Sequence, residues 1–167
     1  MSSRIVSNKT HEEADAILAS TKIIDLLSKL GDVRIGGSYY TNLMYGPDID
    51  ISVATSNARE SAVKFLNQVI KEGAFQKYQY GDFESFPREN RPKDHIVVLI
   101  IPFNNRRWEI EVWFTKNHYD DQVKLEEKLK QLPHSTKEAI IERKARREQS
   151  GVDKHSLSSF EIYQDYI

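Results

Sequence analysis

The 167-residue chain contains no cysteine, which excludes disulfide bonds and thiolate metal sites. An excess of charge of one sign is also missing. The 24 Lys and Arg residues against 25 Asp and Glu give a formal net charge of -1, so no global field draws the protein to nucleic acid or membranes. The longest apolar run, residues 96–103, is far too short to span a bilayer, and residues 1–16 lack the apolar core of a signal peptide. We therefore expect an intracellular, cytoplasmic protein.

Internal repeats, low-complexity linkers and abrupt shifts in composition are missing as well, so a single domain is predicted over residues 1–167. Hydrophobic residues make up 39% of the chain and charged residues 29%, as in an ordinary globular protein. A chain of this length can bury a sizeable core. The periodicities follow the order helix, strands, helix, strands, helices, which indicates an α+β or mixed α/β fold.

Helix signals recur along the chain. Apolar residues at helical spacing predict a helix over residues 10–30 that ends at Gly31, and another over residues 58–72 that ends at Gly73. A further helix is expected from residue 120 to about 132, and two more follow it. Three pairs of residues have the spacing of a capping box, in which each partner satisfies an unpaired amide of the other: Thr10 with Glu13, Ser135 with Glu138, and Ser158 with Glu161.

Strand signals lie between the helices. A short strand is expected over residues 32–35, and another, followed by a loop, within residues 74–93. Residues 95–103 form a continuous apolar run, which is typical of a strand buried on both faces. The Asn-Asn-Arg-Arg sequence at 104–107 then predicts a hairpin turn into a strand over residues 108–114.

Asp48 and Asp50 open a strand in which polar residues alternate with Ile49, Ile51 and Val53. Strand periodicity sends both carboxylates to one face and the apolar side chains to the other. Like charges held side by side are costly unless a cation neutralises them. Carboxylate oxygens are hard ligands that suit Mg²⁺ or Mn²⁺ better than zinc. A metal site is therefore one interpretation, and a solvent-exposed acidic face is the other.

A second acidic strand favours the metal site. On the strand predicted after the hairpin turn, Glu109 and Glu111 share one face, and large apolar residues occupy the opposite face. If the two acidic strands are neighbours, three or four carboxylates converge. Such a cluster can hold two metal ions about 3.5–4 Å apart, as in-line phosphoryl transfer requires. We take Asp48, Asp50 and one of the two glutamates as candidate metal ligands, and all four acids as candidate catalytic residues.

Gly36, Gly37 and Ser38 lie between a short strand and a short helical stretch. Glycines at such a turn let the backbone approach a phosphate closely, and the start of a helix offers unpaired amides. Ser38 is placed to cap that helix or to bind phosphate directly. Tyr39 comes next and can stack on a base, although packing of the helix explains it equally well. These four residues are the candidate nucleotide-binding residues.

This combination resembles the nucleotidyltransferases of the DNA polymerase β superfamily. Their signature is a strand, Gly-Ser, a short helix, an hDhDh strand and a third carboxylate on a later strand. The matching residues, within roughly residues 33–115, are Gly37, Ser38, Asp48, Asp50, and then Glu109 or Glu111. In particular, the chain is similar to the small stand-alone bacterial members. The resemblance implies a mixed sheet backed by helices, with a catalytic core at about 10–116 and C-terminal helices at about 118–167.

The activity that the resemblance implies is of the EC 2.7.7 type. A nucleoside monophosphate moves from a nucleoside triphosphate such as ATP to an acceptor hydroxyl, with release of pyrophosphate and with Mg²⁺ (or Mn²⁺) as cofactor. The chain departs from the family at two points. Residues 40–42 stand where many small relatives have Arg-Gly, and the third acid is glutamate instead of aspartate. Glu111, flanked by Ile110 and Val112, matches the family motif better than Glu109 does.

The sequence does not identify the acceptor. The near-neutral charge disfavours a long polynucleotide, which leaves a small molecule or a protein as the favoured acceptor. The rival interpretation is a non-catalytic relative, such as a regulatory or antitoxin-like binding module, in which the carboxylates are not assembled. The Glu-Arg-Lys-Ala-Arg-Arg-Glu segment at 142–148 predicts a solvated helix face, with a triphosphate contact from Lys144 or Arg147 as the alternative. The histidines have no metal-ligand spacing, and we assign them no metal.

Overall fold

Strand β2 (Asp48–Ala54) has the alternation that its sequence predicts, because burial switches from each residue to the next. Ile49 and Ile51 are buried in the hydrophobic core. Asp48 and Asp50 lie on the opposite, partly exposed face. The division of this strand into an apolar and an acidic face is therefore confirmed.

The other strands join β2 in a single mixed sheet in the computed structural model, which describes residues 2–89, 91–152 and 157–167. They are β1 (Asp32–Ile35), β3 (Lys77–Asp82), β4 (His95–Phe103) and β5 (Arg106–Thr115). The order across the sheet is β1-β2-β5-β4-β3, in which β2 and β5 are parallel and the other neighbouring pairs are antiparallel. The predicted mixed sheet is confirmed.

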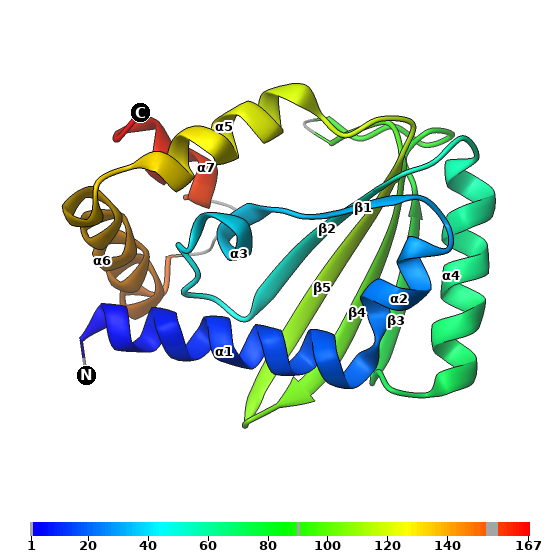
Figure 1. Ribbon diagram of the computed structural model, residues 1–167, viewed down its shortest axis with the longest axis horizontal. Coiled ribbons are helices and arrows are strands. Elements are labelled where there is room, and N and C mark those ends of the chain that lie inside the picture. Colours follow the sequence, from blue (N-terminus) through cyan, green and yellow to red (C-terminus); the bar gives the residue numbers. More distant parts are fainter. Residues whose placement is uncertain (1, 90, 153–156) are drawn as a thin grey trace.

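Helices cover the sheet and extend beyond one end of it (Figure 1). The described residues form α1 (Ser3–Thr21), α2 (Ile23–Ser28), α3 (Gly37–Thr41), α4 (Ala58–Glu72), α5 (Asp120–Gln131), α6 (His134–Ser150) and α7 (Ser159–Gln164). In Figure 1, α4 stands at one end of the molecule, and α5, α6 and α7 gather at the other. None of the described helices combines the length and the apolar character needed to cross a membrane.

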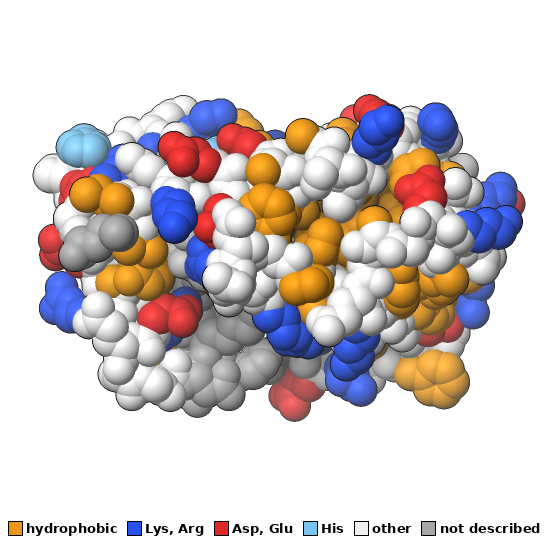
Figure 2. Space-filling model, turned by 90° about the horizontal axis from the view of Figure 1, so that it is seen from below, with side chains coloured by type: hydrophobic (Ala, Val, Ile, Leu, Met, Phe, Trp, Pro, Cys, Tyr) orange, Lys and Arg blue, Asp and Glu red, His pale blue; other side chains and the backbone are white. Residues whose placement is uncertain are grey.

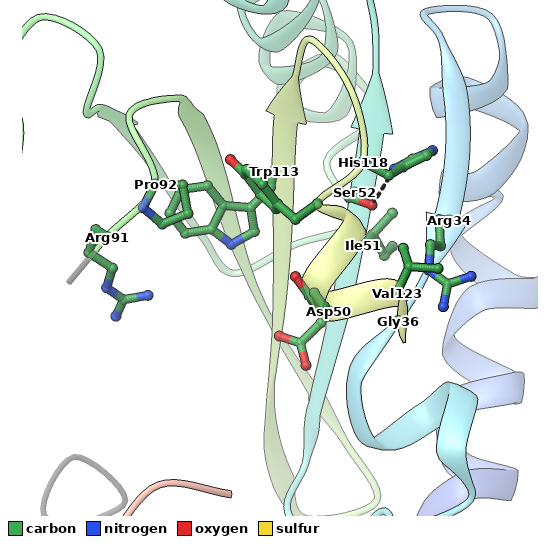
Figure 3. A pocket seen from close by; sticks show the side chains of 12 residues that line it. Arg34, Gly36, Asp50, Ile51, Ser52, Arg91, Pro92, Trp113, His118 and Val123 are labelled. Atoms are coloured by element: carbon green, nitrogen blue, oxygen red, sulfur yellow. Dashed lines mark hydrogen bonds between the residues drawn. The ribbon is translucent and has the colours of Figure 1, made fainter. Parts of the chain in front are cut away.

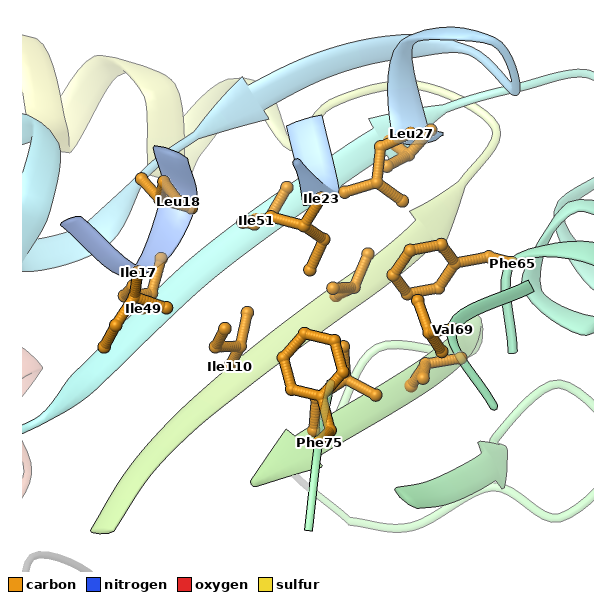
Figure 4. Packing of buried hydrophobic residues seen from close by; sticks show 14 of the residues in the cluster. Ile17, Leu18, Ile23, Leu27, Ile49, Ile51, Phe65, Val69, Phe75 and Ile110 are labelled. Atoms are coloured by element: carbon orange, nitrogen blue, oxygen red, sulfur yellow. The ribbon is translucent and has the colours of Figure 1, made fainter. Parts of the chain in front are cut away.

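The main hydrophobic core lies between the apolar face of the sheet and the helices α1, α2 and α4 (Figure 4). Ile17 of α1, Leu27 of α2 and Phe65 of α4 pack toward Ile51 of β2 and Ile110 of β5. A second, smaller cluster joins the C-terminal helices to the segment that follows α3. Its buried members are Leu43, Leu129, Ile140, Ile141, Ile162 and Tyr163. The C-terminal helices are therefore packed on the segment that links α3 to β2.

Residues with a positive φ angle lie at two turns in the chain. The predicted hairpin between β4 and β5 is confirmed, but its turn has only the two residues Asn104 and Asn105, with φ angles of 48° and 60°, and Arg106 and Arg107 already belong to β5. Lys22 also has a positive φ, of 52°, and it separates α1 from α2. The single helix predicted over residues 10–30 is therefore wrong. Apolar spacing continues across the break because both helices face the same core.

Thr10 and Glu13 are not a capping box. Helix α1 begins at Ser3 with Ser2 as its N-cap, so both residues are in the helix interior, and both are buried. They accept hydrogen bonds from the guanidinium of Arg106, at 2.9 Å and 3.0 Å. Their role is to hold a partly buried arginine of β5 against α1.

The two C-terminal capping boxes have different outcomes. Ser158 and Glu161 form the predicted box at the start of α7, with the Ser158 hydroxyl accepting from the Glu161 amide and the Glu161 carboxylate accepting from the Ser158 amide. The prediction of a capping box formed by Ser135 and Glu138 is wrong. Helix α6 begins at His134, and Pro133 occupies its N-cap without a side-chain hydrogen bond.

This difference gives a matched pair of substitutions. Ser158→Ala removes a cap from α7, and we expect it to lower the free energy of unfolding by about 1 kcal/mol. Ser135→Ala has the same chemistry at a position that caps nothing, so its effect is expected to stay within about 0.5 kcal/mol. Urea titration of both variants measures the difference. Equal losses would contradict this assignment of the caps.

Candidate active site

The parallel pairing of β2 with β5 brings the two acidic strands side by side. In this register Asp48 is opposite Glu109, and Asp50 is opposite Glu111. Residues opposed across neighbouring strands share a face of the sheet. The structure therefore places all four candidate catalytic acids on one face. The sequence predicted the face of each pair, and the tertiary fold made the two strands neighbours.

Asp50 lies in a concentration of negative charge. Desolvation by the surrounding protein, together with repulsion from Asp48, Glu111 and Glu126, raises the pKa of Asp50 from 3.8 to about 7. Lys144 acts in the opposite direction. Carboxylates that repel one another in this way do not all ionise readily without a neutralising cation. The cluster therefore favours a bound cation, and without one it favours a proton on Asp50.

The glycine turn at the start of α3 closes against Asp50. The Gly36 amide donates a hydrogen bond to the backbone carbonyl of Asp50 at 2.9 Å. Gly37 has a φ of 60°, in the left-handed region, and a Cβ built at this position would collide with Oδ2 of Asp50. Glycine is needed at position 37 both for its backbone conformation and for the space it leaves to the carboxylate.

Glu126 of α5 is a site residue that sequence reasoning missed. Its side chain is buried, with the residue 3% exposed. Oε1 accepts hydrogen bonds from the Gly37 amide at 2.7 Å and from Gln122 at 3.1 Å, and Oε2 pairs with Arg34 at 2.6 Å. A glutamate in an amphipathic helix is ordinary, so no local pattern distinguishes it. Its partners on β1 and α3 lie far away in the sequence.

The other two candidate nucleotide-binding residues have different surroundings. Ser38 is buried in the first turn of α3. The ring of Tyr39 stacks on His11 with centroids 4.4 Å apart, and its hydroxyl donates to Asp15 at 2.7 Å. Desolvation and the hydrogen bond to Asp15 raise the pKa of Tyr39 to about 12. The Tyr39 side chain therefore packs α3 on α1.

The charged segment of α6 is only in part the solvated face that its sequence predicts, since Glu142 and Arg146 are exposed and form an i,i+4 ion pair but other charged residues are buried. Lys144 and Arg147 are 2% and 7% exposed. The Lys144 ammonium donates to the carbonyl of Leu43 and to the hydroxyl of Tyr163, both at 2.8 Å. This cation also lowers the pKa of Asp50. The prediction failed for Lys144 and Arg147 because a charge pattern within one helix does not show which other segments cover it.

A cavity of about 200 Å³ opens beside Asp50 (Figure 3). Arg34 and Arg91 contribute two guanidinium groups to its walls, and Trp113 of β5 lies between Asp50 and the side of Arg91. A carboxylate with two guanidinium groups suits a metal-bound phosphate, because the carboxylate attracts the metal and the guanidinium groups attract phosphate oxygens.

Among the residues that the structure describes, one group of three places metal-ligand atoms within 4.8 Å of one another, namely Asp82, Glu84 and His95. It lies on the β3 side of the sheet, where Asp82 is opposite His95. The guanidinium of Arg59 is 2.8 Å from the Asp82 carboxylate, and His95 Nε2 is 3.0 Å from Glu84. Arg59 thus already supplies a positive charge to this group. Sequence spacing did not reveal it because strand pairing brings the three residues together.

No protein-family model matches the chain, and no curated protein sequence matches it. Several solved structures are similar in fold. The Cid1 poly(U) polymerase with Mg and 3'-dATP bound has a TM-score of 0.61 and 14% identity, covering 84% of this chain and 42% of that one. The polymerase core of TRAMP, an RNA surveillance complex, has a TM-score of 0.62 and 19% identity, covering 90% and 46%. A cytoplasmic RNA terminal U-transferase has a TM-score of 0.60 and 19% identity, covering 91% and 45%.

The chain spans less than half the length of each of these three proteins. The similarity covers between 84% and 91% of this chain. This likeness shows that the chain shares the fold of the matching parts of these enzymes.

Proposed function

We propose that the protein is a metal-dependent nucleotidyltransferase that moves a nucleoside monophosphate from a nucleoside triphosphate to an acceptor hydroxyl, with release of pyrophosphate. The observation that carries this proposal is the pairing of Asp50 with Glu111 on parallel strands, beside the Gly36-Gly37 turn. The fold similarity to nucleotidyltransferases supports the general kind of reaction. The Mg and 3'-dATP bound to Cid1 support a metal and a nucleotide as the ligands.

The chemistry of the donor set fits Mg²⁺ or Mn²⁺. Asp48, Asp50 and Glu111 offer only carboxylate oxygens, which these ions prefer. The pKa of Asp50 is raised by desolvation and by repulsion from Asp48, Glu111 and Glu126, and a bound cation would offset both effects. When bound, the ion would activate the acceptor hydroxyl and neutralise charge on the triphosphate. Glu111 is the favoured third ligand because it is opposite Asp50 and perturbs it, whereas Glu109 is opposite Asp48.

The remaining roles follow from position. The backbone of Gly36 and Gly37, with Ser38, would hold the β and γ phosphates, and Tyr39 would contribute only its backbone. Arg34 lines the cavity beside Asp50 and can pair with phosphate oxygens there. Catalysis then consists mainly of positioning the reactants and neutralising charge.

We propose a small-molecule or protein hydroxyl as the acceptor. The formal net charge of -1 gives the protein little long-range attraction for a polynucleotide. On the face seen in Figure 2, basic and acidic side chains are interspersed, with hydrophobic groups between them. A protein that holds a long nucleic acid by its backbone usually presents basic side chains clustered along one face.

Calorimetric titration with ATP, GTP, CTP and UTP, with and without Mg²⁺, tests the proposal. We expect metal-dependent binding of at least one nucleotide. The double substitution Asp48→Asn/Asp50→Asn is expected to weaken it at least about a hundredfold, because the metal ligands are lost. Asp82→Asn is the matched control. It alters the acidic group on β3 and is expected to leave binding unchanged.

Each other outcome has a definite meaning. Binding that survives Asp48→Asn/Asp50→Asn but disappears in Asp82→Asn would move the metal site to the β3 side of the sheet and contradict the proposal. No binding of any nucleotide would favour the rival interpretation, a non-catalytic relative that keeps the fold.

A further inference from the structure

Strand β2 presents one more polar side chain on its acidic face. Ser52 follows Asp50 by two residues, so strand alternation places it on the same side of the sheet. Both residues line the cavity of about 200 Å³ that also contains Arg34 and Arg91. The roles proposed so far leave the Ser52 hydroxyl without a function.

The Ser52 hydroxyl belongs to a chain of three groups. Its Oγ lies 2.8 Å from Nδ1 of His118, as the dashed line in Figure 3 marks, and Nε2 of His118 lies 3.2 Å from a carboxylate oxygen of Asp32. Both contacts are satisfied when Ser52 donates to Nδ1 and Nε2–H donates to Asp32. This order of hydroxyl, imidazole and carboxylate activates a serine nucleophile in hydrolases and transferases.

Three separate elements hold this arrangement. Ser52 is in the interior of β2 and is opposite Arg34 of β1, whose first residue is Asp32. His118 is in the loop between β5 and α5, which the hydrogen bond from Thr115 to the carbonyl of Asn117 restrains at 2.8 Å. The His118 side chain is 19% exposed, whereas that of Asp32 is 82% exposed. Asp32 is therefore a positioning residue for the imidazole, in contact with solvent.

We propose that Ser52 is an acceptor hydroxyl, so that the protein transfers a nucleoside monophosphate to its own Ser52. This inference rests on the proposed function and names its acceptor as a protein side chain. Successive residues on one face of a strand are about 7 Å apart. An α-phosphoryl group bound beside Asp50 therefore lies within reach of the Ser52 hydroxyl. Arg34 and Arg91 line the same cavity, so the positive charge of both guanidinium groups favours a phosphate there.

The step balances without a further reactant. A bond forms between Ser52 Oγ and the α-phosphorus, and the bond from that phosphorus to the pyrophosphate oxygen breaks. The hydroxyl proton moves to Nδ1 of His118, and Asp32 stabilises the resulting imidazolium. The products are pyrophosphate and a phosphodiester that links Ser52 to the nucleoside.

The first test is incubation of the full chain with Mg²⁺ and each nucleoside triphosphate, followed by intact-mass measurement and peptide mapping. We expect one nucleoside monophosphate, attached at Ser52, and none on Ser52→Ala. His118→Gln is expected to slow the modification about a hundredfold, because the proton acceptor is lost. Ser61→Ala and His134→Gln are the matched controls. They change the same residue types away from the cavity and are expected to react at the wild-type rate.

The second test needs neither metal nor nucleotide. A fluorophosphonate probe, applied in the presence of a chelator, is expected to label Ser52 in the wild type and to do so about tenfold more slowly in His118→Gln. An imidazole that only anchors the loop would leave labelling unchanged between these two proteins, and that result would overturn the inference.

Calorimetry on the same wild-type sample distinguishes failure of Ser52 as the acceptor from failure of the proposed nucleotidyltransferase activity. Nucleotide binding without modification, or modification at another residue, would overturn the role of Ser52 and leave the nucleotidyltransferase proposal standing. Absence of nucleotide binding would remove both.

Discussion

Asp50→Asn is expected to stabilise the metal-free protein at pH 8, raising its Tm by about 5 °C or more. The reason is the crowding of carboxylates around Asp50. Desolvation and repulsion from Asp48, Glu111 and Glu126 raise its pKa from 3.8 to about 7. At pH 8 the folded protein must hold this group ionised, at a cost of up to about 4 kcal/mol relative to the unfolded chain. Asparagine removes the charge and keeps the shape.

The sign of the pH dependence follows from the same shift. Because the pKa of Asp50 is higher in the folded state, its contribution to stability is fully present below about pH 4. It declines as pH rises and is lost above about pH 7. The difference in stability between Asp50→Asn and the wild type is therefore expected to grow between pH 4 and pH 7, and then to level off.

Thermal unfolding in a chelating buffer at pH 5 and pH 8 measures this effect, and repeating it with Mg²⁺ links stability to the site. Mg²⁺ is expected to raise the Tm of the wild type but not that of Asp50→Asn, since only the wild type offers the full set of ligands. Asp25→Asn, at an exposed position on α2, is the control. It is expected to change neither the Tm of the metal-free protein nor the rise in Tm on addition of Mg²⁺. A variant that is less stable than the wild type at pH 8 would contradict the crowding of charge at Asp50.

Gly37→Ala is expected to damage both the fold and the site. Gly37 has a φ of 60°, which costs an alanine about 1–2 kcal/mol, and the new Cβ would collide with Oδ2 of Asp50. Either Asp50 or the turn must move, so the proposed metal ligand leaves its position. We expect a loss of about 3 kcal/mol in the free energy of unfolding and at least about tenfold weaker binding of metal and nucleotide.

The chain offers a matched control at the end of α4. Gly73 has a φ of 68°, but a Cβ built there has open space around it. Gly73→Ala therefore carries only the backbone cost of about 1–2 kcal/mol and is expected to leave nucleotide binding intact. Urea unfolding and calorimetry on both variants separate the two contributions. Equal effects on binding would mean that contact with Asp50 is not what makes glycine necessary at position 37.

Local features of this protein could be predicted from sequence because they depend on backbone geometry over a few residues. The period of two in β2 fixed which face Asp48 and Asp50 share. Asn104 and Asn105 mark the hairpin because asparagine tolerates a left-handed conformation. Ser158 and Glu161 form their capping box because both partners lie within one helical turn.

The same local reasoning failed where a contact with a distant segment decided the outcome. Thr10 and Glu13 have the spacing of a capping box, yet they bind Arg106 from within a helix. Lys144 belongs to a charge pattern typical of an exposed helix, yet it is buried against Leu43 and Tyr163. In each case the sequence pattern is present, but contact with a distant segment gives the residues a different structural role.

By itself, the sequence determined the acidic and apolar faces of β2 and the glycine turn at the start of α3, because strand period and glycine conformation are local properties. The tertiary structure alone decided that β2 lies parallel to β5 with Asp50 opposite Glu111, that Glu126 binds the Gly37 amide, and that His118 reaches Ser52. These contacts join segments far apart in the chain. Their register is set by how the core packs as a whole, and no short stretch of sequence contains that information.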